Sequence, residues 1–287
     1  MNSGPMPMPP RILAIAGSDS SGGAGIQADI KTITMLGGYA MTAITAVTAQ
    51  NTTGVQAVEV LPADLVVAQI ESSLSDIGAD AVKIGMLGSP EIAHAVADRI
   101  ESLGIPVVFD PVMVATSGSV LADEPTIDAF GRLMKIATVT TPNLPELRAL
   151  SGMEVLDEIS QERAAAHLIE GIGARAILAK GGHWPGFVIG SDGRRESTDQ
   201  EVFDVLYSWS SEGHVADLVW NHERIDTRHT HGTGCTLSSA IATLLGQGHP
   251  LDHAVGEARA FVRAALEAAP GFGAGHGPMG HQAVRRP

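Results

Sequence analysis

The chain has 287 residues, of which 44% are hydrophobic and 17% charged, a balance typical of a compact globular protein rather than a disordered one. Its formal net charge of -14 argues against nucleic acid or an anionic membrane surface as partners. One cysteine excludes an internal disulfide, the first ten residues lack a signal-peptide core, and no apolar run reaches the ~18 residues that span a bilayer, so we expect a cytoplasmic protein.

Short apolar runs alternate along the chain with stretches of helical periodicity. We predict strands at residues 11–16, 43–49, 55–60, 81–84, 107–109, 138–141 and 176–179. We predict helices at residues 26–36, 65–77, 92–103, 127–137, 145–150 and 161–172, and two more that begin near Gly234 and Leu251. Residues 186–229 read as β-rich. This alternation predicts an α/β domain over residues 11–269, with a mostly parallel sheet covered on both faces, between loose tails at 1–10 and 270–287.

A glycine-rich turn at residues 17–25 follows the first strand and precedes the first helix. Its glycines would let the backbone approach a ligand closely, although a flexible strand–helix turn explains them equally well. It is not a Walker A loop, because no Gly-Lys-Ser/Thr follows.

Polar or glycine residues also follow other predicted strands. They are Gln50, Gly85, Asp110, Asn143 and Lys180. Ligands of parallel sheets bind beyond the carboxyl ends of the strands, so these positions are candidates for one site.

Lys180, Asn143 and Glu146 each allow two interpretations. Lys180 is either a solvated surface lysine or a cation that neutralises phosphate. Asn143 and Glu146 either cap a helix or hold a hydrated Mg²⁺, which prefers oxygen ligands.

The chain's only cysteine closes the motif Thr-His-Gly-Thr-Gly-Cys at residues 230–235, and an apolar helical stripe follows directly. A glycine turn that opens a helix presents unpaired N–H groups and the positive end of the helix dipole, which together attract anions. A lone cysteine is more often a small buried hydrophobe. At a helix N-terminus, however, the thiolate of Cys235 is favoured.

These segments together resemble the ribokinase-like kinases, most closely the bacterial hydroxymethylpyrimidine/phosphomethylpyrimidine kinases of thiamine biosynthesis. The similarity runs in the family's order through residues 16–29, 45–52, 83–87, 110–113, 141–146, 180–183, 230–236 and 275–278. It implies a three-layer sandwich and ATP- and Mg²⁺-dependent phosphorylation of 4-amino-5-hydroxymethyl-2-methylpyrimidine and of its monophosphate. It also leads us to expect a homodimer.

The resemblance assigns roles on the nucleotide side of the site. Lys180 would lie near the ATP phosphates, with Asn143, Glu146 and Asp110 around Mg²⁺, whose direct ligands would be Glu146 and Asp110. The N–H groups of Gly232, Thr233, Gly234 and Cys235 would stabilise the transferring phosphoryl group. Cys235 stands where related sugar kinases have an Asp base, so it would accept the hydroxyl proton.

The pyrimidine would lie between the first glycine loop, at Gly17, and the strand end that carries Thr48 and Gln50. The Gln50 amide offers a donor and an acceptor to an aminopyrimidine edge. Met86 and Val112 would contact the ring, and Asp29 is a weaker candidate for a polar substrate group.

Two features depart from the family's pattern. Thr116 and Ser119 stand where a Lys and an Asp are usual, and residues 184–200 form a longer stretch than usual. Two alternatives stay open, namely a pyridoxal kinase of the same fold and a non-catalytic sensor that binds the pyrimidine.

Overall fold

A nine-stranded sheet runs through the computed structural model, which describes residues 8–115, 118, 121–183, 187–189, 195–197, 201–210 and 215–284. The strands are β1 (Arg11–Asp19), β2 (Tyr39–Asn51), β3 (Gly54–Val60), β4 (Ala81–Ile84), β5 (Val107–Phe109), β6 (Val139–Thr140), β7 (Ala176–Ala179), β10 (Glu201–Trp209) and β11 (Val215–Glu223). Their order is β11-β10-β7-β6-β5-β4-β1-β2-β3. The six strands from β7 to β2 are parallel, and β3, β10 and β11 add antiparallel edges.

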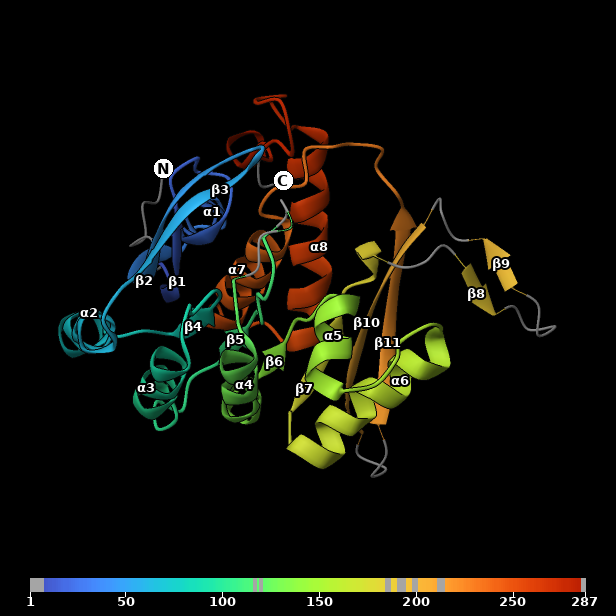
Figure 1. The fold of residues 1–287 in the computed structure, drawn as a ribbon, viewed down its shortest axis with the longest axis horizontal. Coiled ribbons are helices and arrows are strands. Elements are labelled where there is room, and N and C mark those ends of the chain that lie inside the picture. Colours follow the sequence, from blue (N-terminus) through green and yellow to red (C-terminus); the bar gives the residue numbers. More distant parts are fainter. Residues whose placement is uncertain are drawn as a thin grey trace, which may run out of the picture.

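Helices cover both faces of this sheet, which makes a three-layer sandwich (Figure 1). One layer contains α2 (Ala63–Asp76), α3 (Pro90–Ile100), α4 (Glu124–Ile136), α5 (Leu144–Ser151) and α6 (Glu158–His167). The other contains α1 (Gly25–Met35), α7 (Thr233–Gly246) and α8 (Leu251–Glu267). The predicted α/β fold with a mostly parallel, doubly covered sheet is confirmed.

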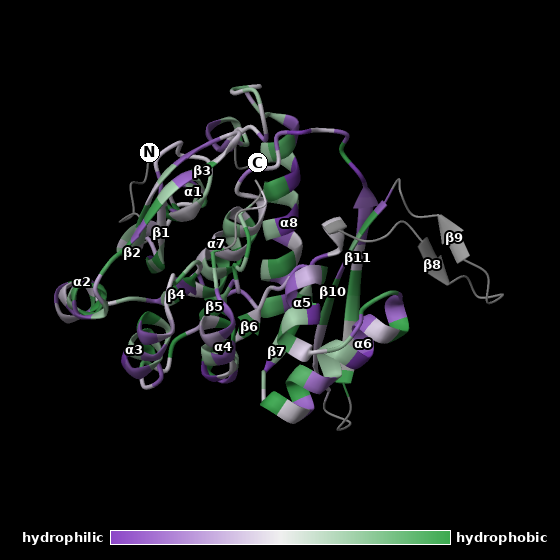
Figure 2. Ribbon diagram, in the orientation of Figure 1, coloured by the Kyte–Doolittle hydropathy of each residue, from purple (hydrophilic) through white to green (hydrophobic). Residues whose placement is uncertain are grey.

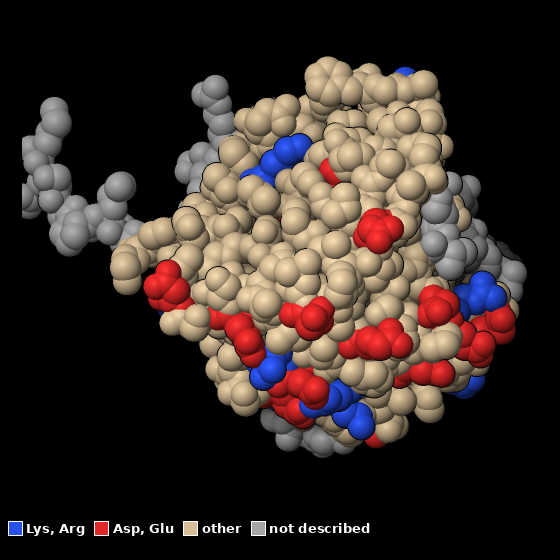
Figure 3. Space-filling model, turned by 60° about the vertical axis from the view of Figure 1, so that its left-hand side comes forward, with Lys and Arg blue, Asp and Glu red and all other residues tan. Residues whose placement is uncertain are grey.

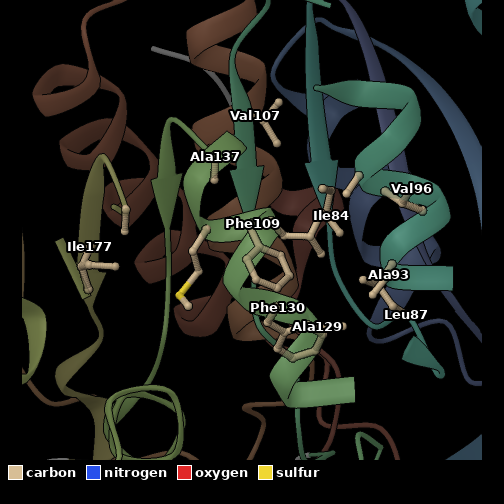
Figure 4. Packing of buried hydrophobic residues seen from close by; sticks show 14 of the residues in the cluster. Ile84, Leu87, Ala93, Val96, Val107, Phe109, Ala129, Phe130, Ala137 and Ile177 are labelled. Atoms are coloured by element: carbon tan, nitrogen blue, oxygen red, sulfur yellow. The ribbon is translucent and has the colours of Figure 1, made fainter. Parts of the chain in front are cut away.

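Successive side chains of a strand point to opposite faces of the sheet, and this alternation explains why two separate cores form. In β4, Val82 and Ile84 join the core under the α2–α6 layer, whereas Ala81 joins the core under α1, α7 and α8. In the first core, the rings of Phe109 and Phe130 meet edge to face, with centroids 5.1 Å apart (Figure 4). Figure 2 shows apolar residues along the strands and on the inner sides of the helices. Apolar burial on both faces is what holds a parallel sheet between two helical layers.

Most predicted elements occur within a few residues of the expected limits, but two strands are longer than predicted. β1 continues through Asp19 and β2 runs from Tyr39 to Asn51. The glycine-rich turn begins inside β1, because Ser18 pairs with Val47 and Asp19 with Thr48. The turn is therefore anchored to the sheet over its first residues rather than free.

The prediction of a loose C-terminal tail is wrong for residues 275–284. The His276 N–H donates to the Thr52 carbonyl at 2.8 Å, and the Gly277 carbonyl accepts from the His231 N–H at 3.1 Å. His281 is buried against α7, where its Nε2 lies 2.8 Å from Thr236 Oγ1. Polar composition suggested a solvated tail, but tertiary contacts hold the segment.

Charged side chains lie mainly along one band of the surface that Figure 3 draws, with Asp and Glu more numerous than Lys and Arg there. In the part of the chain that the structure describes, no helix is both long and apolar enough to cross a membrane.

Some sequence expectations lie outside the described residues. They concern Thr116, Ser119 and residues 184–200, of which the structure describes only a short two-stranded ladder of β8 (Phe187–Ile189) and β9 (Arg195–Ser197).

Candidate active site

A cleft of about 860 Å³ lies where the carboxyl ends of β1, β2, β4 to β7 and the N-terminus of α7 meet. In the sheet, β1 lies between β2 and β4. The chain runs from β1 to β2 and β3 on one side and then crosses to β4 on the other side. Such a reversal opens a crevice at the strand ends, which is where ligands of open α/β sheets bind.

Lys180 points into this cleft from the end of β7 and links two carboxylates. Its Nζ lies 2.8 Å from Asp110 Oδ1 and 3.8 Å from Glu146 Oε2. Burial alone would lower the pKa of Lys180, but Asp110 and Glu146 outweigh burial and raise it, so the ammonium stays charged. The alternative of a solvated surface lysine is therefore wrong, since the side chain is only 15% exposed.

Asp110 carries its negative charge in a buried environment. Burial would raise the pKa of this carboxyl, but Lys180 and Lys83 together hold it below its usual range. Thr141 Oγ1 also donates to Asp110 Oδ1 at 3.0 Å. A Cβ on Gly234 would lie 3.3 Å from both Asp110 Oδ2 and Lys180 Nζ, so this pair directly faces the first turn of α7.

The interpretation of Asn143 and Glu146 as helix-capping residues is confirmed, and their role at a Mg²⁺ stays a prediction. Asn143 Oδ1 accepts from the Glu146 N–H at 2.9 Å, and Glu146 Oε2 accepts from the Asn143 N–H at 2.7 Å. This reciprocal capping box begins α5. Both residues also line the cleft. Burial, aided by Asp110 and opposed by Lys180, raises the pKa of Glu146.

The oxygen donors in the cleft fit Mg²⁺. Asp110 and Glu146 supply two carboxylates, and Mg²⁺ typically takes one or two carboxylates and completes its shell with water and substrate phosphates. No cluster of three or more His, Cys, Asp or Glu able to hold a metal occurs among the residues with described positions. Two protein carboxylates would leave the rest of a Mg²⁺ shell to water and to the phosphates of a nucleotide.

The turn before α7 has the geometry of an anion site. Gly232 is the N-cap of α7 and has φ +85°, and a Cβ there would lie 2.0 Å from the Gly23 carbonyl oxygen. Only glycine fits this left-handed, close-packed position. The two glycine loops predicted from the sequence therefore touch each other through their backbones, and the N-terminus of α7 opens into the cleft beside Gly234 and Cys235.

The expectation that Cys235 favours its thiolate is wrong. Burial, aided by Asp29 and Asp110, raises the pKa of this thiol to about 11. Lys83 and a hydrogen bond from the Gly25 N–H act in the opposite direction but do not compensate. At neutral pH, about one molecule in 10⁴ carries the thiolate.

The structure brings together five of the residues predicted to bind the substrate. Along the cleft they are Gly17, Thr48, Gln50, Met86 and Val112. The Gln50 backbone is held by Ser20, whose Oγ donates to the Gln50 carbonyl and accepts from its N–H, both at 2.9 Å. Thr48 Oγ1 donates to the Ser18 carbonyl at 2.9 Å, so its hydroxyl proton is already used within the protein.

Asp29 is not brought to the cleft. Its side chain is fully buried and forms an ion pair with Lys83, whose Nζ lies 3.0 Å from both carboxylate oxygens. Ser239 of α7 also donates to Asp29 Oδ1 at 2.7 Å. The sequence prediction is wrong here because Lys83, placed in an apolar strand, demands a buried counter-charge.

Two polar groups of the cleft were missed from the sequence. One is the hydrogen-bonded pair of Asp19 and His231, with 2.8 Å between Oδ2 and Nε2. The other is Asp204, which accepts from the Gly181 N–H at 2.9 Å and from Arg259 Nε at 2.6 Å. Asp19 has a signal in the sequence, since Asp followed by Ser and Gly is typical of a side chain that binds its own turn. Asp204 and Arg259 are 55 residues apart, and no local pattern joins them.

Comparison with known proteins gives a consistent result. A family model described as phosphomethylpyrimidine kinase matches residues 19–280. A hydroxymethylpyrimidine/phosphomethylpyrimidine kinase of Streptomyces coelicolor is 43% identical over 274 residues, covering 95% of this chain and 94% of the relative.

Two solved structures share the fold closely. An ADP complex of Bacillus subtilis pyridoxal kinase is 35% identical with a TM-score of 0.82, covering 96% of this chain and 98% of the other. A phosphomethylpyrimidine kinase from Clostridium difficile 630 is 35% identical with a TM-score of 0.74, covering 89% of this chain and 99% of the other.

Proposed function

The chain belongs to the phosphomethylpyrimidine kinase family, and from this premise we propose that it transfers phosphoryl groups from ATP to 4-amino-5-hydroxymethyl-2-methylpyrimidine and then to the monophosphate. The product of the second transfer is the diphosphate used in thiamine biosynthesis. Phosphoryl transfer depends mainly on positioning and on stabilising charge, so the arrangement of charged groups in the cleft supports the proposal.

One observation carries the proposal. Lys180, Asp110 and Glu146 face the N-terminal turn of α7 in the same cleft that Gln50, Met86 and Val112 line. A cation, two carboxylates and a helix N-terminus are the groups that bind a polyphosphate with its metal. A protein that only sensed the pyrimidine would need none of them.

On the nucleotide side, Lys180 neutralises the phosphates of ATP. Asp110 and Glu146 hold the Mg²⁺, which supplies positive charge on the transferring phosphoryl group, and Asn143 orients Glu146 through the capping box. The N–H groups of Gly232, Thr233, Gly234 and Cys235 stabilise the negative charge that develops during transfer.

On the pyrimidine side, Gln50 binds the edge of the ring, while Met86 and Val112 contact its faces and Gly17 and Thr48 bound the pocket. The two transfers differ in their need for a base. The hydroxymethyl group must lose its proton, and Cys235 accepts it in the small fraction of molecules whose thiol is ionised. The phosphate of the monophosphate is largely ionised at neutral pH and attacks without a base.

Pyridoxal kinase activity is the second candidate, because a pyridoxal kinase of known structure superposes on this chain with a TM-score of 0.82. Both substrates are six-membered nitrogen rings with a hydroxymethyl group, and Gln50 and Met86 line the cleft that would receive either ring.

A coupled assay of ADP release tests both candidates with the free pyrimidine, its monophosphate and pyridoxal. We expect turnover of both pyrimidines and a lower kcat/KM on pyridoxal. Faster turnover of pyridoxal would reverse the order, and binding of the pyrimidine without any ADP release would indicate a sensor. The expected homodimer stays a prediction, which sedimentation equilibrium measures.

A further inference from the structure

Asp204, on β10, binds the backbone directly after Lys180. Its buried carboxylate accepts from the Gly181 N–H through Oδ1, at 2.9 Å. On the other side of Lys180, the Lys180 N–H donates to the Pro142 carbonyl, also at 2.9 Å. Both peptide groups that flank the Lys180 Cα are therefore fixed, one by β10 and one by the segment that follows β6. Together these two bonds set the direction in which the Lys180 side chain leaves the backbone.

Gly181 packs directly against β10. A Cβ on Gly181 would lie 1.7 Å from the Phe203 carbonyl oxygen and 3.0 Å from the Phe203 nitrogen. Only glycine allows the backbone to come this close to a neighbouring strand. The N–H of Gly181 is buried at this contact, and a buried N–H needs an acceptor, which Asp204 supplies.

Arg259, on α8, binds the other oxygen of the same carboxylate. Its Nε donates to Asp204 Oδ2 at 2.6 Å, and both side chains are 10% exposed. Nη2 of Arg259 lies 2.6 Å from Nδ1 of His222, on β11. Burial and the charge of Arg259 lower the pKa of His222, so the ring is neutral and Nδ1 can accept this bond. The orientation of the Asp204 carboxylate is thus fixed from α8, which shares a core with α7.

From these contacts we propose that Asp204 is a positioning residue for phosphoryl transfer, which acts through the Gly181 N–H to present the Lys180 ammonium to the phosphates of ATP. Lys180 Nζ already lies 2.8 Å from Asp110 Oδ1 and 3.8 Å from Glu146 Oε2, so the cation is in place before the nucleotide binds. Through α8, the same carboxylate connects the end of β7 to the helical layer that carries the turn before α7. The inference rests on the proposed function and deepens it.

Two double variants isolate the bond to Gly181. Asp204→Asn/Arg259→Met keeps an acceptor for the Gly181 N–H, because the Asn carbonyl no longer has to serve a second donor. Asp204→Leu/Arg259→Met has the same branched shape at position 204 but no acceptor. Neither protein leaves a buried charge of this pair without a partner. Arg259 also lines the cleft, and its loss is common to both variants.

The first readout is kcat/KM for ATP with the monophosphate, whose transfer needs no base. The second is the Kd of the Mg²⁺ complex of a non-hydrolysable imido analogue of ATP. Relative to the Asn double variant, we expect the Leu double variant to lose about tenfold in kcat/KM and about fivefold in affinity for the analogue, because a small displacement of a catalytic group is costly. The Kd of the pyrimidine should be the same in both.

The same two variants in a Lys180→Ala background separate positioning from a structural role. If the acceptor at position 204 acts through Lys180, the Asn and Leu proteins should then agree within about twofold in kcat/KM. A merely structural role would lower the rate by the same factor with or without Lys180.

Asp157→Leu is the matched control. Asp157 likewise accepts from a backbone N–H, that of Ser160 in the first turn of α6, at 2.8 Å. It is not among the described residues that line the cleft. The variant should leave kcat/KM and the Kd of the analogue unchanged.

Equal kcat/KM and equal Kd in the folded Asn and Leu double variants overturn the proposal, as does an undiminished difference between them in the Lys180→Ala background. Asp204→Ala/Arg259→Met replaces the Leu double variant if that protein does not fold. A wild-type protein that binds the ATP analogue but releases no ADP with any of the three substrates would instead contradict the proposed function. The Kd of the analogue then decides the inference alone.

Discussion

Lys180 is the residue whose removal most directly tests the nucleotide side of the site. It bridges Asp110 and Glu146 and is held at the end of β7 by Gly181, whose N–H donates to Asp204. We expect Lys180→Ala to lower kcat/KM by roughly 10²-fold, about 3 kcal/mol of transition-state stabilisation.

Lys180→Arg is a useful companion variant, because it keeps the charge but changes the geometry. We expect partial activity from it. Near-wild-type kinetics in a folded Lys180→Ala protein would exclude Lys180 from the reaction.

Cys235 leads to a prediction about pH. Burial raises the pKa of the thiol to about 11, so if the thiolate accepts the hydroxyl proton, kcat on the alcohol substrate rises by about tenfold per pH unit between pH 7 and 9. The rate on the monophosphate, which needs no base, should lack this slope.

Cys235→Ala and Cys235→Ser supply the comparison. Both should lose roughly 10²–10⁴-fold in kcat on the alcohol, much less on the monophosphate, and the pH slope as well. If both transfers fall equally, Cys235 contributes geometry rather than proton transfer.

At the scale of elements, the C-terminal segment differs most from its prediction, because it was expected to be a loose tail and is instead held by tertiary contacts. Residues 275–284 contact the β2–β3 turn, the turn before α7 and α7 itself. His231 lies in the turn before α7 and Thr236 lies in the first turns of α7. The segment therefore supports the anion site.

His281 makes this docking sensitive to acid. Burial lowers the pKa of His281 to about 4, so the folded state keeps the ring neutral while the unfolded chain protonates it near pH 6.5. The stabilisation is complete above pH 6.5 and is lost as the pH falls, about 3 kcal/mol at pH 4.

Urea unfolding of wild type and His281→Met between pH 7 and 4 measures this loss. We expect the variant to show a smaller decline in the free energy of unfolding. His249→Met, at an exposed histidine, is the control and should follow the wild-type curve. Parallel curves for all three proteins would contradict the assignment.

At the scale of the whole molecule, the pair of Lys83 and Asp29 joins the central strand β4 to α1, and Ser239 connects it to α7. Both side chains are 0% exposed, so removing one charge leaves the other buried without a partner. We expect Lys83→Met to cost about 3–5 kcal/mol of unfolding free energy.

The double variant Lys83→Met/Asp29→Leu removes both charges and should recover most of that loss. Chemical denaturation of the two single variants and the double variant measures the coupling. Additive losses would show that the two side chains do not depend on each other.

Much of the fold could be predicted from the sequence because its signals are local. Strands such as β4 and β5 are short apolar runs between polar turns, and the helices show the 3.6-residue period of a buried stripe. The order of strand ends also predicted that Asp110, Asn143 and Lys180 meet, since parallel strands end at one edge.

The pairing of the buried charges could not be predicted from the sequence. The sequence left Asp29 as a candidate for binding a substrate. In the structure, its carboxylate instead forms an ion pair with Lys83, 54 residues away. Cys235 stands at a helix N-terminus, yet burial beside two carboxylates keeps it a thiol. The sequence therefore predicted the fold class and many of the groups that meet at the cleft, because periodicity and strand-end position are local properties, and its motifs identified the family by resemblance. Protonation states, the Asp19–His231 hydrogen bond and the docking of the C-terminal segment depend on desolvation and on groups brought together from distant parts of the chain, which no local pattern encodes.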